Sequence, residues 1–225
     1  MEFRRINQNV NRLSAIDTYR YFYLAVKANW ITHETHIKQS TLAEAWNLKK
    51  SSAVIKRFEV AELLAKDKEY IGGQYGVFPR NTYHIIIGKW VGISVELLNE
   101  PISDELKGFL ILLKSFCINY TNRCLYTAPD ELADWMIKLK TEDIERLLNE
   151  AEQAGYIKGE SEKDKRFITL TRDDLFMVWE ESEGQKLYRI YPHPFTQEEC
   201  DDMLQPRGTP DYENKPYPNN KSRTP

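Results

Sequence analysis

The chain of 225 residues is poor in cysteine and contains no long apolar run. Its longest apolar stretch, Gly108–Phe116, is interrupted by Lys114 and is shorter than the roughly 18 to 20 apolar residues of a membrane-spanning helix. Residues 1–14 contain arginines but no apolar core, so we expect no signal peptide. The three cysteines lack the spacing of a metal site, which predicts reduced thiols without structural disulfides. We therefore expect a cytoplasmic protein with no membrane partner.

Motifs of common enzyme chemistry are also missing. The sequence has no Cys/His cluster and no Gly-x-Ser-x-Gly turn. The glycines within residues 72–76 are not followed by a helix that begins with Lys and Ser or Thr, as a phosphate-binding loop requires. His33 and His36 are spaced to share a helix face, but no third ligand accompanies them, and we interpret them as surface residues. These absences predict a protein that is not an enzyme and that holds neither a cofactor nor a metal.

The net charge of the whole chain is only −3, but the charged residues are unevenly distributed along it. Residues 1–92 contain 14 Lys and Arg against 8 Asp and Glu, a net charge of +6. Residues 93–180 contain 11 against 18, a net charge of −7, and residues 181–225 contain 6 against 8, a net charge of −2. This sign reversal predicts two units with different partners, whereas an alternative interpretation attributes it to drift.

Residues 14–92 have the pattern of three helices and a hairpin. Apolar spacing predicts a first helix over Ser14–Trp30, capped by Ser14, with Ile16, Tyr19, Tyr23, Val26 and Trp30 facing the core. A short second helix, capped by Ser40 or Thr41, is predicted over Gln39–Leu48, and a third over Lys49–Asp67, with Leu64 and Ala65 on its apolar side. Gly and Pro punctuate the β-branched segment Glu69–Gly88, which predicts a β-hairpin.

Residues 100–172 repeat this order. We expect a helix over Ser103–Asn119 capped by Ser103, and a short helix with Pro129 in its first turn. A third helix, capped by Thr141 and ended by Gly155, precedes a second hairpin. The repeat spacing of about 90 residues indicates a duplicated architecture. The predicted fold is mainly α with small β-hairpins, an α+β protein with units at residues 1–92 and 93–180 and a Pro-rich extended tail at 181–225.

Two segments carry a resemblance to a known fold family. "LAEAWNLKKSSAVIKRF" in the first unit and "LADWMIKLKTEDIERLLNEAEQAGYI" in the second resemble winged helix-turn-helix domains. Two such domains in one chain are similar to plasmid-type replication initiators and replisome-organising proteins, and the plan is shared with transcription regulators and chromosome-partition factors. The resemblance implies that the third helix of each unit is a recognition helix and that the hairpin is a wing.

On this resemblance, the first unit binds double-stranded DNA. A recognition helix meets base edges with its N-terminal residues, and phosphates are contacted by flexible cations. The expected contacts are Lys49, Lys50, Ser51, Ser52, Lys56 and Arg57 on the helix, Gln74 and Arg80 on the hairpin, and Arg4 and Arg5 in an N-terminal arm. An alternative interpretation is that the lysines are ordinary surface residues and the two serines form a helix cap.

The third helix of the second unit is acidic, and phosphates would repel it. We therefore expect the second unit to mediate protein contact, with a homodimer as the specific hypothesis and Glu145, Asn149 and Glu152 facing the partner. The favoured function is a non-enzymatic DNA-binding protein of replication-initiator or transcription-regulator type. The alternative is a protein-interaction scaffold that does not bind DNA.

Overall fold

The computed structural model describes residues 2–73, 76–118, 121–126, 128–162, 165–182 and 185–189. These residues form six α-helices, two short 3-10 helices and ten strands, which confirms the predicted α+β class. The order is β1 (Phe3–Asn7), η1 (Gln8–Arg12), α1 (Ala15–Val26), β2 (Glu34–Thr35), α2 (Gln39–Ala45), α3 (Ser52–Val60), β3 (Leu64–Gly73), β4 (Gly76–Ile85), β5 (Trp90–Ser94), η2 (Val95–Asn99), α4 (Asp104–Phe116), β6 (Arg123–Leu125), α5 (Pro129–Trp135), α6 (Thr141–Gln153), β7 (Ile157–Glu162), β8 (Lys165–Leu170), β9 (Val178–Ser182) and β10 (Gln185–Arg189).

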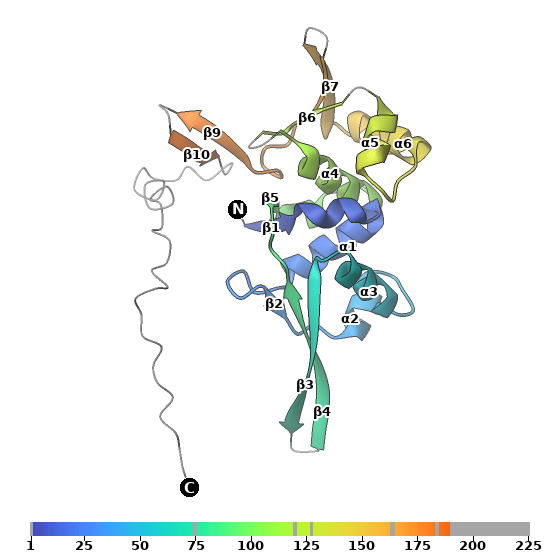
Figure 1. The fold of residues 1–225 in the computed structure, drawn as a ribbon, viewed down its shortest axis with the longest axis vertical. Coiled ribbons are helices and arrows are strands. Elements are labelled where there is room, and N and C mark those ends of the chain that lie inside the picture. The colour runs from blue at the N-terminus through green and yellow to red at the C-terminus, as the bar shows by residue number, and fades with distance from the viewer. Residues whose placement is uncertain are drawn as a thin grey trace.

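The two predicted units, residues 1–92 and 93–180, repeat one topology in the residues that the structure describes. Each contains a helix, a short strand, two helices and a hairpin, in the order α1-β2-α2-α3-β3-β4 and α4-β6-α5-α6-β7-β8. In each unit the short strand pairs with the last strand, so the sheets are ordered β2-β4-β3 and β6-β8-β7. All these pairs are antiparallel. The two hairpins extend from opposite ends of the molecule (Figure 1).

The ends of α3 and α6 correspond residue by residue. Glu62, which follows α3, has φ 59°, and Gly155, which follows α6, has φ 76°. The backbone bonds around them correspond at the same separation of 93 residues: Leu63 N–H to Phe58 O and Tyr156 N–H to Ala151 O, and Ala61 N–H to Arg57 O and Ala154 N–H to Glu150 O. A residue in α3 therefore has its counterpart in α6 at its own number plus 93.

Two of the expected helix starts are confirmed. The Ser14 hydroxyl accepts from the Asp17 amide at 3.3 Å, and the Ser103 hydroxyl accepts from the Leu106 amide at 3.1 Å. The other caps were wrong, because Lys38 and Lys140 occupy the N-cap positions of α2 and α6 and make no side-chain cap bond. The expected length of the third helix was also wrong. It ends at Val60, and Leu64 and Ala65 belong to β3.

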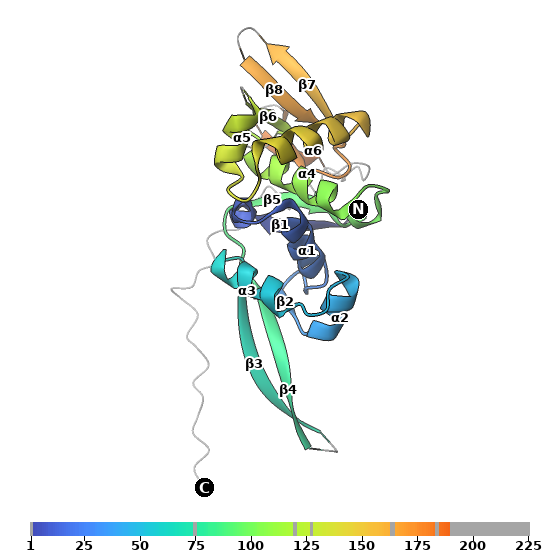
Figure 2. The same ribbon diagram turned by 90° about the vertical axis from the view of Figure 1, so that its right-hand side faces the viewer.

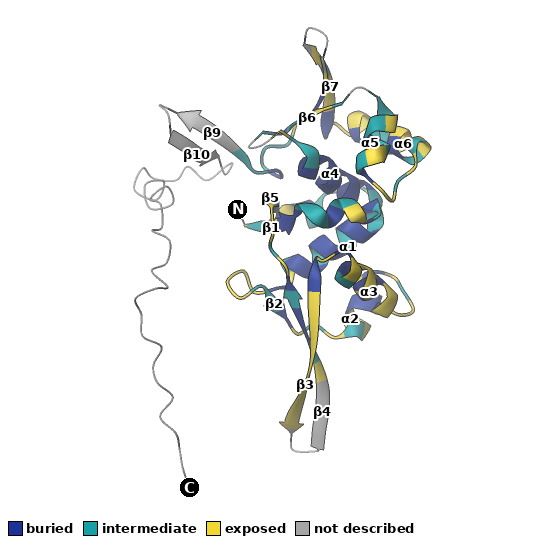
Figure 3. Ribbon diagram, viewed as in Figure 1, coloured by how far each residue is buried: buried dark blue, intermediate teal, exposed yellow. Residues whose placement is uncertain are grey.

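The expected core face of the first helix was partly wrong. Trp30 lies outside α1 and is 67% exposed, whereas Tyr21, Phe22 and Leu24 are fully buried (Figure 3). The other expected residues, Ile16, Tyr19, Tyr23 and Val26, are only half-buried. The buried residues of α1 belong to one contiguous cluster that includes residues of α4 and α6. The two units therefore share a single core.

Helices α1 and α4 cross at the centre of that core (Figure 2). The crossing is close at Gly108, where a Cβ would stand 1.7 Å from the Ala15 carbonyl oxygen and 3.0 Å from the Tyr19 amide nitrogen. Only a residue without a side chain fits between these backbones. The crossing fixes how the two units sit relative to each other.

Strand β5 joins the units a second time. It pairs antiparallel with β1 along five residues. On its other side, the Ser94 amide donates to Leu175 O at 2.9 Å and the Met177 amide donates to Gly92 O at 3.0 Å. The boundary expected between residues 92 and 93 thus lies inside a strand that is bonded to both units. Within the described residues, no helix is long and apolar enough to span a bilayer.

Candidate nucleic-acid interface

The start of α3 presents an exposed basic edge. Lys49, Lys50 and Ser52 are exposed, and no ion pair joins either lysine to another residue in the described part of the chain. The turn before them is held by the Leu48 amide, which donates to Ala43 O at 2.8 Å, and by Asn47, which has φ 50°. These constraints fix where the helix begins and so where its first side chains point.

The neighbouring serine is not part of that edge. Ser51 is buried, with 2% of its surface exposed, and its hydroxyl donates to Gln39 O at 2.8 Å. It stands at the N-cap of α3 but makes no capping bond. Lys56 is exposed one turn further along and lies 3.6 Å from Glu59. Lys49, Lys50, Ser52 and Lys56, at the start of α3 and one turn along it, are exposed and, among the described residues, make no hydrogen bond to α1, and we call them the α3 basic face.

Arg57 is held by a carboxylate of α1. Its Nε donates to Asp17 Oδ2 at 2.6 Å and its Nη2 donates to Asp17 Oδ1 at 3.0 Å. The Asp17 side chain is 7% exposed and also accepts from Arg20 Nη1 at 3.0 Å. These hydrogen bonds raise the pKa of Arg57. Arg57, one of the expected DNA contacts, is thus engaged in joining α3 to α1.

The hairpin β3–β4 has two faces of different character. Leu64 is buried against the helices, and side chains alternate along a strand, so Lys66, Lys68 and Tyr70 share the face of Leu64. All three are exposed, and Lys68 Nζ lies 5.3 Å from the centre of the Tyr70 ring. No acidic residue of β3 lies on this face. Sequence reasoning missed this face because it extended the third helix to Asp67, which placed Lys66 in a helix and left Lys68 outside the predicted hairpin.

On the opposite face of the hairpin, the ionisable side chains contact one another. Arg80 Nη2 donates to Glu69 Oε2 at 2.9 Å across the register pair. His84 lies between Glu34 at 3.2 Å and Asp67 at 3.0 Å. Arg80 therefore lies on the opposite face of the hairpin from Lys66 and Lys68. Gln74, the other expected hairpin contact, lies outside the described residues.

Two further sequence expectations concern arginines and histidines. Arg4 and Arg5 do not form a free arm, because both lie in β1 and pair with β5. Arg4 Nη2 also donates to Val26 O at 3.4 Å, and Arg5 lies over the Trp90 ring at 5.0 Å. In the part of the chain that the structure describes, no group of three or more His, Cys, Asp or Glu side chains is placed to hold a metal ion.

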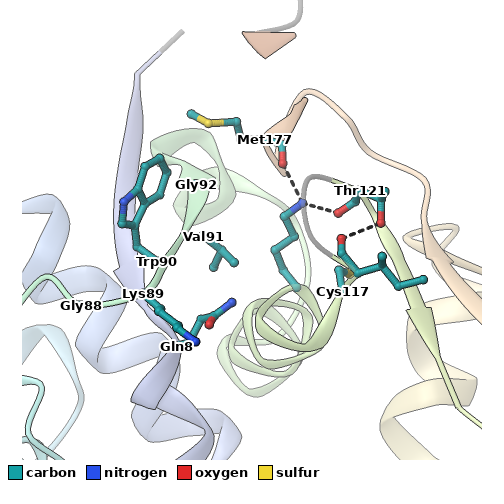
Figure 4. A pocket seen from close by; sticks show the side chains of 11 residues that line it. Gln8, Gly88, Lys89, Trp90, Val91, Gly92, Cys117, Thr121 and Met177 are labelled. Carbon is teal, nitrogen blue, oxygen red and sulfur yellow. Dashed lines mark hydrogen bonds between the residues drawn. The ribbon is translucent and has the colours of Figure 1, made fainter. Parts of the chain in front are cut away.

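A cavity lies between the two units, away from α3. It has a volume of about 710 Å³ and is lined by η1, β5, the C-terminal turn of α4 and Met177. Figure 4 shows Trp90 and Gln8 on one side of this cavity and Thr121 and Cys117 on the other. Lys114 also lines the cavity, and its Nζ donates to Thr121 O at 2.8 Å, Met177 O at 2.6 Å and Asn122 Oδ1 at 2.6 Å. All three of its protons are used by these bonds. This lysine therefore joins α4 to the segment that returns to β5.

Neither side chain with nucleophilic potential at this cavity is activated. Burial lowers the pKa of Lys114 to about 8, but its hydrogen bonds hold the amino group against the wall. Burial raises the pKa of Cys117 to about 12, so the thiol stays protonated. The cavity therefore lacks the pair of nucleophile and base that covalent catalysis requires.

Comparison of the chain with protein-family models, with curated proteins and with solved structures gave no significant match.

Proposed function

We propose that the first unit is a winged helix-turn-helix domain that binds double-stranded DNA. In this proposal α3 lies in the major groove, and Lys66, Lys68 and Tyr70 of the hairpin contact the neighbouring backbone. The observation that carries it is the α3 basic face, which lies on the same side of the sheet as the lysines of β3. The four lysines at positions 49, 50, 66 and 68 have no ion-pair partner in the described chain.

The distribution of partners within the unit supports this assignment. Arg57 and Arg80 are each paired with a carboxylate, Asp17 and Glu69. Lys49, Lys50, Lys66 and Lys68 have no such partner among the described residues, and they would release counterions from DNA on binding. The topology of each unit, with the short strand beside the last strand of the hairpin, is the one expected of a winged helix. We assign the chain to non-enzymatic, cytoplasmic DNA-binding proteins of the replication-initiator or transcription-regulator type.

The test is fluorescence anisotropy of a labelled duplex with the full chain across a salt series. The full chain is required because the two halves share one core. We expect a dissociation constant of about micromolar or better at low salt, rising steeply with salt. The variant K49Q/K50Q should reduce the magnitude of the salt slope by about two units, since each lost phosphate contact accounts for about 0.9.

The matched control is K138Q/K140Q. Lys138 and Lys140 are exposed and precede α6 as Lys49 and Lys50 precede α3, so the control removes the same charge from the other unit. This control variant should have the same salt slope as the unmodified chain, within experimental error. Equal effects of the two double variants would mean that net charge, rather than the α3 basic face, governs binding. Selection of bound duplexes from a random pool then identifies the preferred site.

A further inference from the structure

The α3 basic face has an acidic counterpart on α6. At a separation of 93 residues, Ser52 of α3 corresponds to Glu145 of α6 and Lys56 to Asn149, whereas the numbers of Lys49 and Lys50, in the turn before α3, match those of Glu142 and Asp143 in the first turn of α6. Residues 49–60 contain four Lys and Arg and one Glu, a net charge of +3. The corresponding residues 142–153 contain one Arg and five Asp and Glu, a net charge of −4. One structural position therefore carries opposite charge in the two units.

The acidic side chains of α6 are largely unneutralised. Arg146 pairs with Glu105 at 2.9 Å and approaches Glu150 at 3.6 Å. Glu142, Glu145 and Glu152 have no ion pair with any residue in the described ranges, and all three are exposed. We call these three the α6 acidic face. Like the α3 basic face, it presents unpaired charges of one sign to solvent.

A groove runs along α6 beside its hairpin. It has a volume of about 330 Å³ and is bordered by Glu145, Asn149 and Glu152. Leu148, which is half-buried, and Ile157 are apolar residues among its lining. A long basic side chain suits such a groove, because its methylene stem can pack on these residues while its charge meets the carboxylates. Large apolar side chains are also exposed near both faces, Val60 at the end of α3 and Ile137 before α6.

Helices α3 and α6 lie on the same side of the molecule. In Figure 1 α3 and α6 are both on the right, and in Figure 2, which turns that side to the viewer, both lie at the front. A second copy turned end over end, with this side facing the first, brings the α3 of each copy opposite the α6 of the other. The two-fold axis then generates two identical contacts, so the assembly closes as a dimer.

We propose that the α6 acidic face binds the α3 basic face of a second copy of this chain, forming an antiparallel dimer. Charge complementarity selects this pairing over a symmetric contact between two α6 helices, in which unpaired carboxylates would face each other. The homodimer expected from the sequence placed the interface on the second unit, and this proposal adds the first unit of the other copy as its partner. Because the dimer uses Lys49, Lys50 and Lys56, it covers the surface to which we assign DNA binding. That consequence rests on the proposed function, whereas the dimer itself does not.

Sedimentation velocity of the full chain without DNA tests the proposal. We expect a concentration-dependent dimer at low salt, and a dissociation constant at least about tenfold weaker at several times the physiological ionic strength, where screening is strong. Two charge-reversed variants address the contact directly: K49E/K50E/K56E on α3 and E142K/E145K/E152K on α6. Every substituted side chain is exposed, and circular dichroism verifies that each variant is folded.

The decisive measurement mixes the two variants. A dimer of either variant with itself would place like charges opposite each other in both contacts, so each variant alone should remain monomeric. Their equimolar mixture has opposite charges at both contacts, so it should dimerise at least as well as the unmodified chain. A monomeric mixture, or unmodified chain that stays monomeric at low salt, overturns the proposal, as does dimerisation of either variant alone. DNA binding does not enter this measurement, so its outcome is independent of the proposed function.

Discussion

Arg57 on α3 and Asp17 on α1 form a two-pronged ion pair, with Nε–Oδ2 at 2.6 Å and Nη2–Oδ1 at 3.0 Å. The carboxylate is nearly buried, and the guanidinium side chain is half exposed. Arginine suits this geometry because its planar fork matches a carboxylate. The pair fixes the orientation of α3 relative to α1, which in turn rests on α4. It therefore positions the α3 basic face.

Replacing Arg57 should lower stability. Arg57→Ala leaves Asp17 with Arg20 as its only charged partner, and we expect a loss of about 1–2 kcal/mol in the free energy of unfolding. Lys56→Ala, one residue away and exposed, should change stability by less than about 0.5 kcal/mol. Urea denaturation compares the two. Unchanged stability of Arg57→Ala, together with lost discrimination between DNA sequences, would instead mean that Arg57 reads bases.

The sequence predicts the local features of this fold better than the distant contacts. Ser14 and Ser103 are recognisable caps because capping is decided within three residues. The end of α6 is signalled by Gly155, whereas the corresponding position after α3 is Glu62, which carries no stop signal although its φ is also positive. The apolar spacing continues through Leu64, so the predicted helix ran into β3.

That error concealed part of the candidate interface. Lys66 was assigned to the end of a helix and Lys68 lay before the predicted hairpin, so the hairpin face that they share with Tyr70 was not recognised. The partners of Arg57 and Arg80 depend on contacts that the chain makes after folding. For Arg57 the partner is 40 residues away in sequence. Residue type alone made both arginines candidates for DNA contact, and only the structure identifies their carboxylate partners.

The hairpin lysines give a second test of the interface. K66Q/K68Q should weaken binding to all duplexes alike and reduce the magnitude of the salt slope by about two units, since both side chains would contact phosphates. Arg80→Gln on the opposite face of the same hairpin is the control and should leave the slope unchanged. Fluorescence anisotropy at several salt concentrations measures both. A larger effect from Arg80→Gln would place DNA on the other face of the ribbon.

The crossing of α1 and α4 is sensitive to a single methyl group. In Gly108→Ala the new Cβ would collide with the Ala15 carbonyl, which is backbone and cannot rotate away. We expect a loss of about 3 kcal/mol or more, or failure to fold. Gly72→Ala is the control, because nothing lies within 4 Å of a Cβ at that position. Thermal unfolding of both variants distinguishes the close approach from a general cost of replacing glycine.

Lys114 makes the stability of the protein depend on pH in a defined direction. Lys114→Met leaves Met177 O, Thr121 O and Asn122 Oδ1 without their donor, so we expect a loss of about 2–4 kcal/mol at neutral pH. Burial lowers the pKa of Lys114 from 10.5 to about 8. At a pH between these two pKa values, Lys114 has lost its proton in the folded chain but keeps it in the unfolded chain. The unfolded state therefore binds more protons, and the free energy of unfolding rises with pH.

The stability of the unmodified chain relative to Lys114→Met should therefore increase above pH 8 and level off near the ordinary lysine pKa. The slope of this increase is at most about 1.4 kcal/mol per pH unit. Below pH 8 the difference should be constant, because the lysine is charged in both states. Urea denaturation of both proteins across this range measures the difference, and the subtraction cancels the titration of cysteines and tyrosines that the two chains share. If the difference in free energy of unfolding between the two proteins narrows above pH 8, the folded state prefers the charged ammonium form of Lys114.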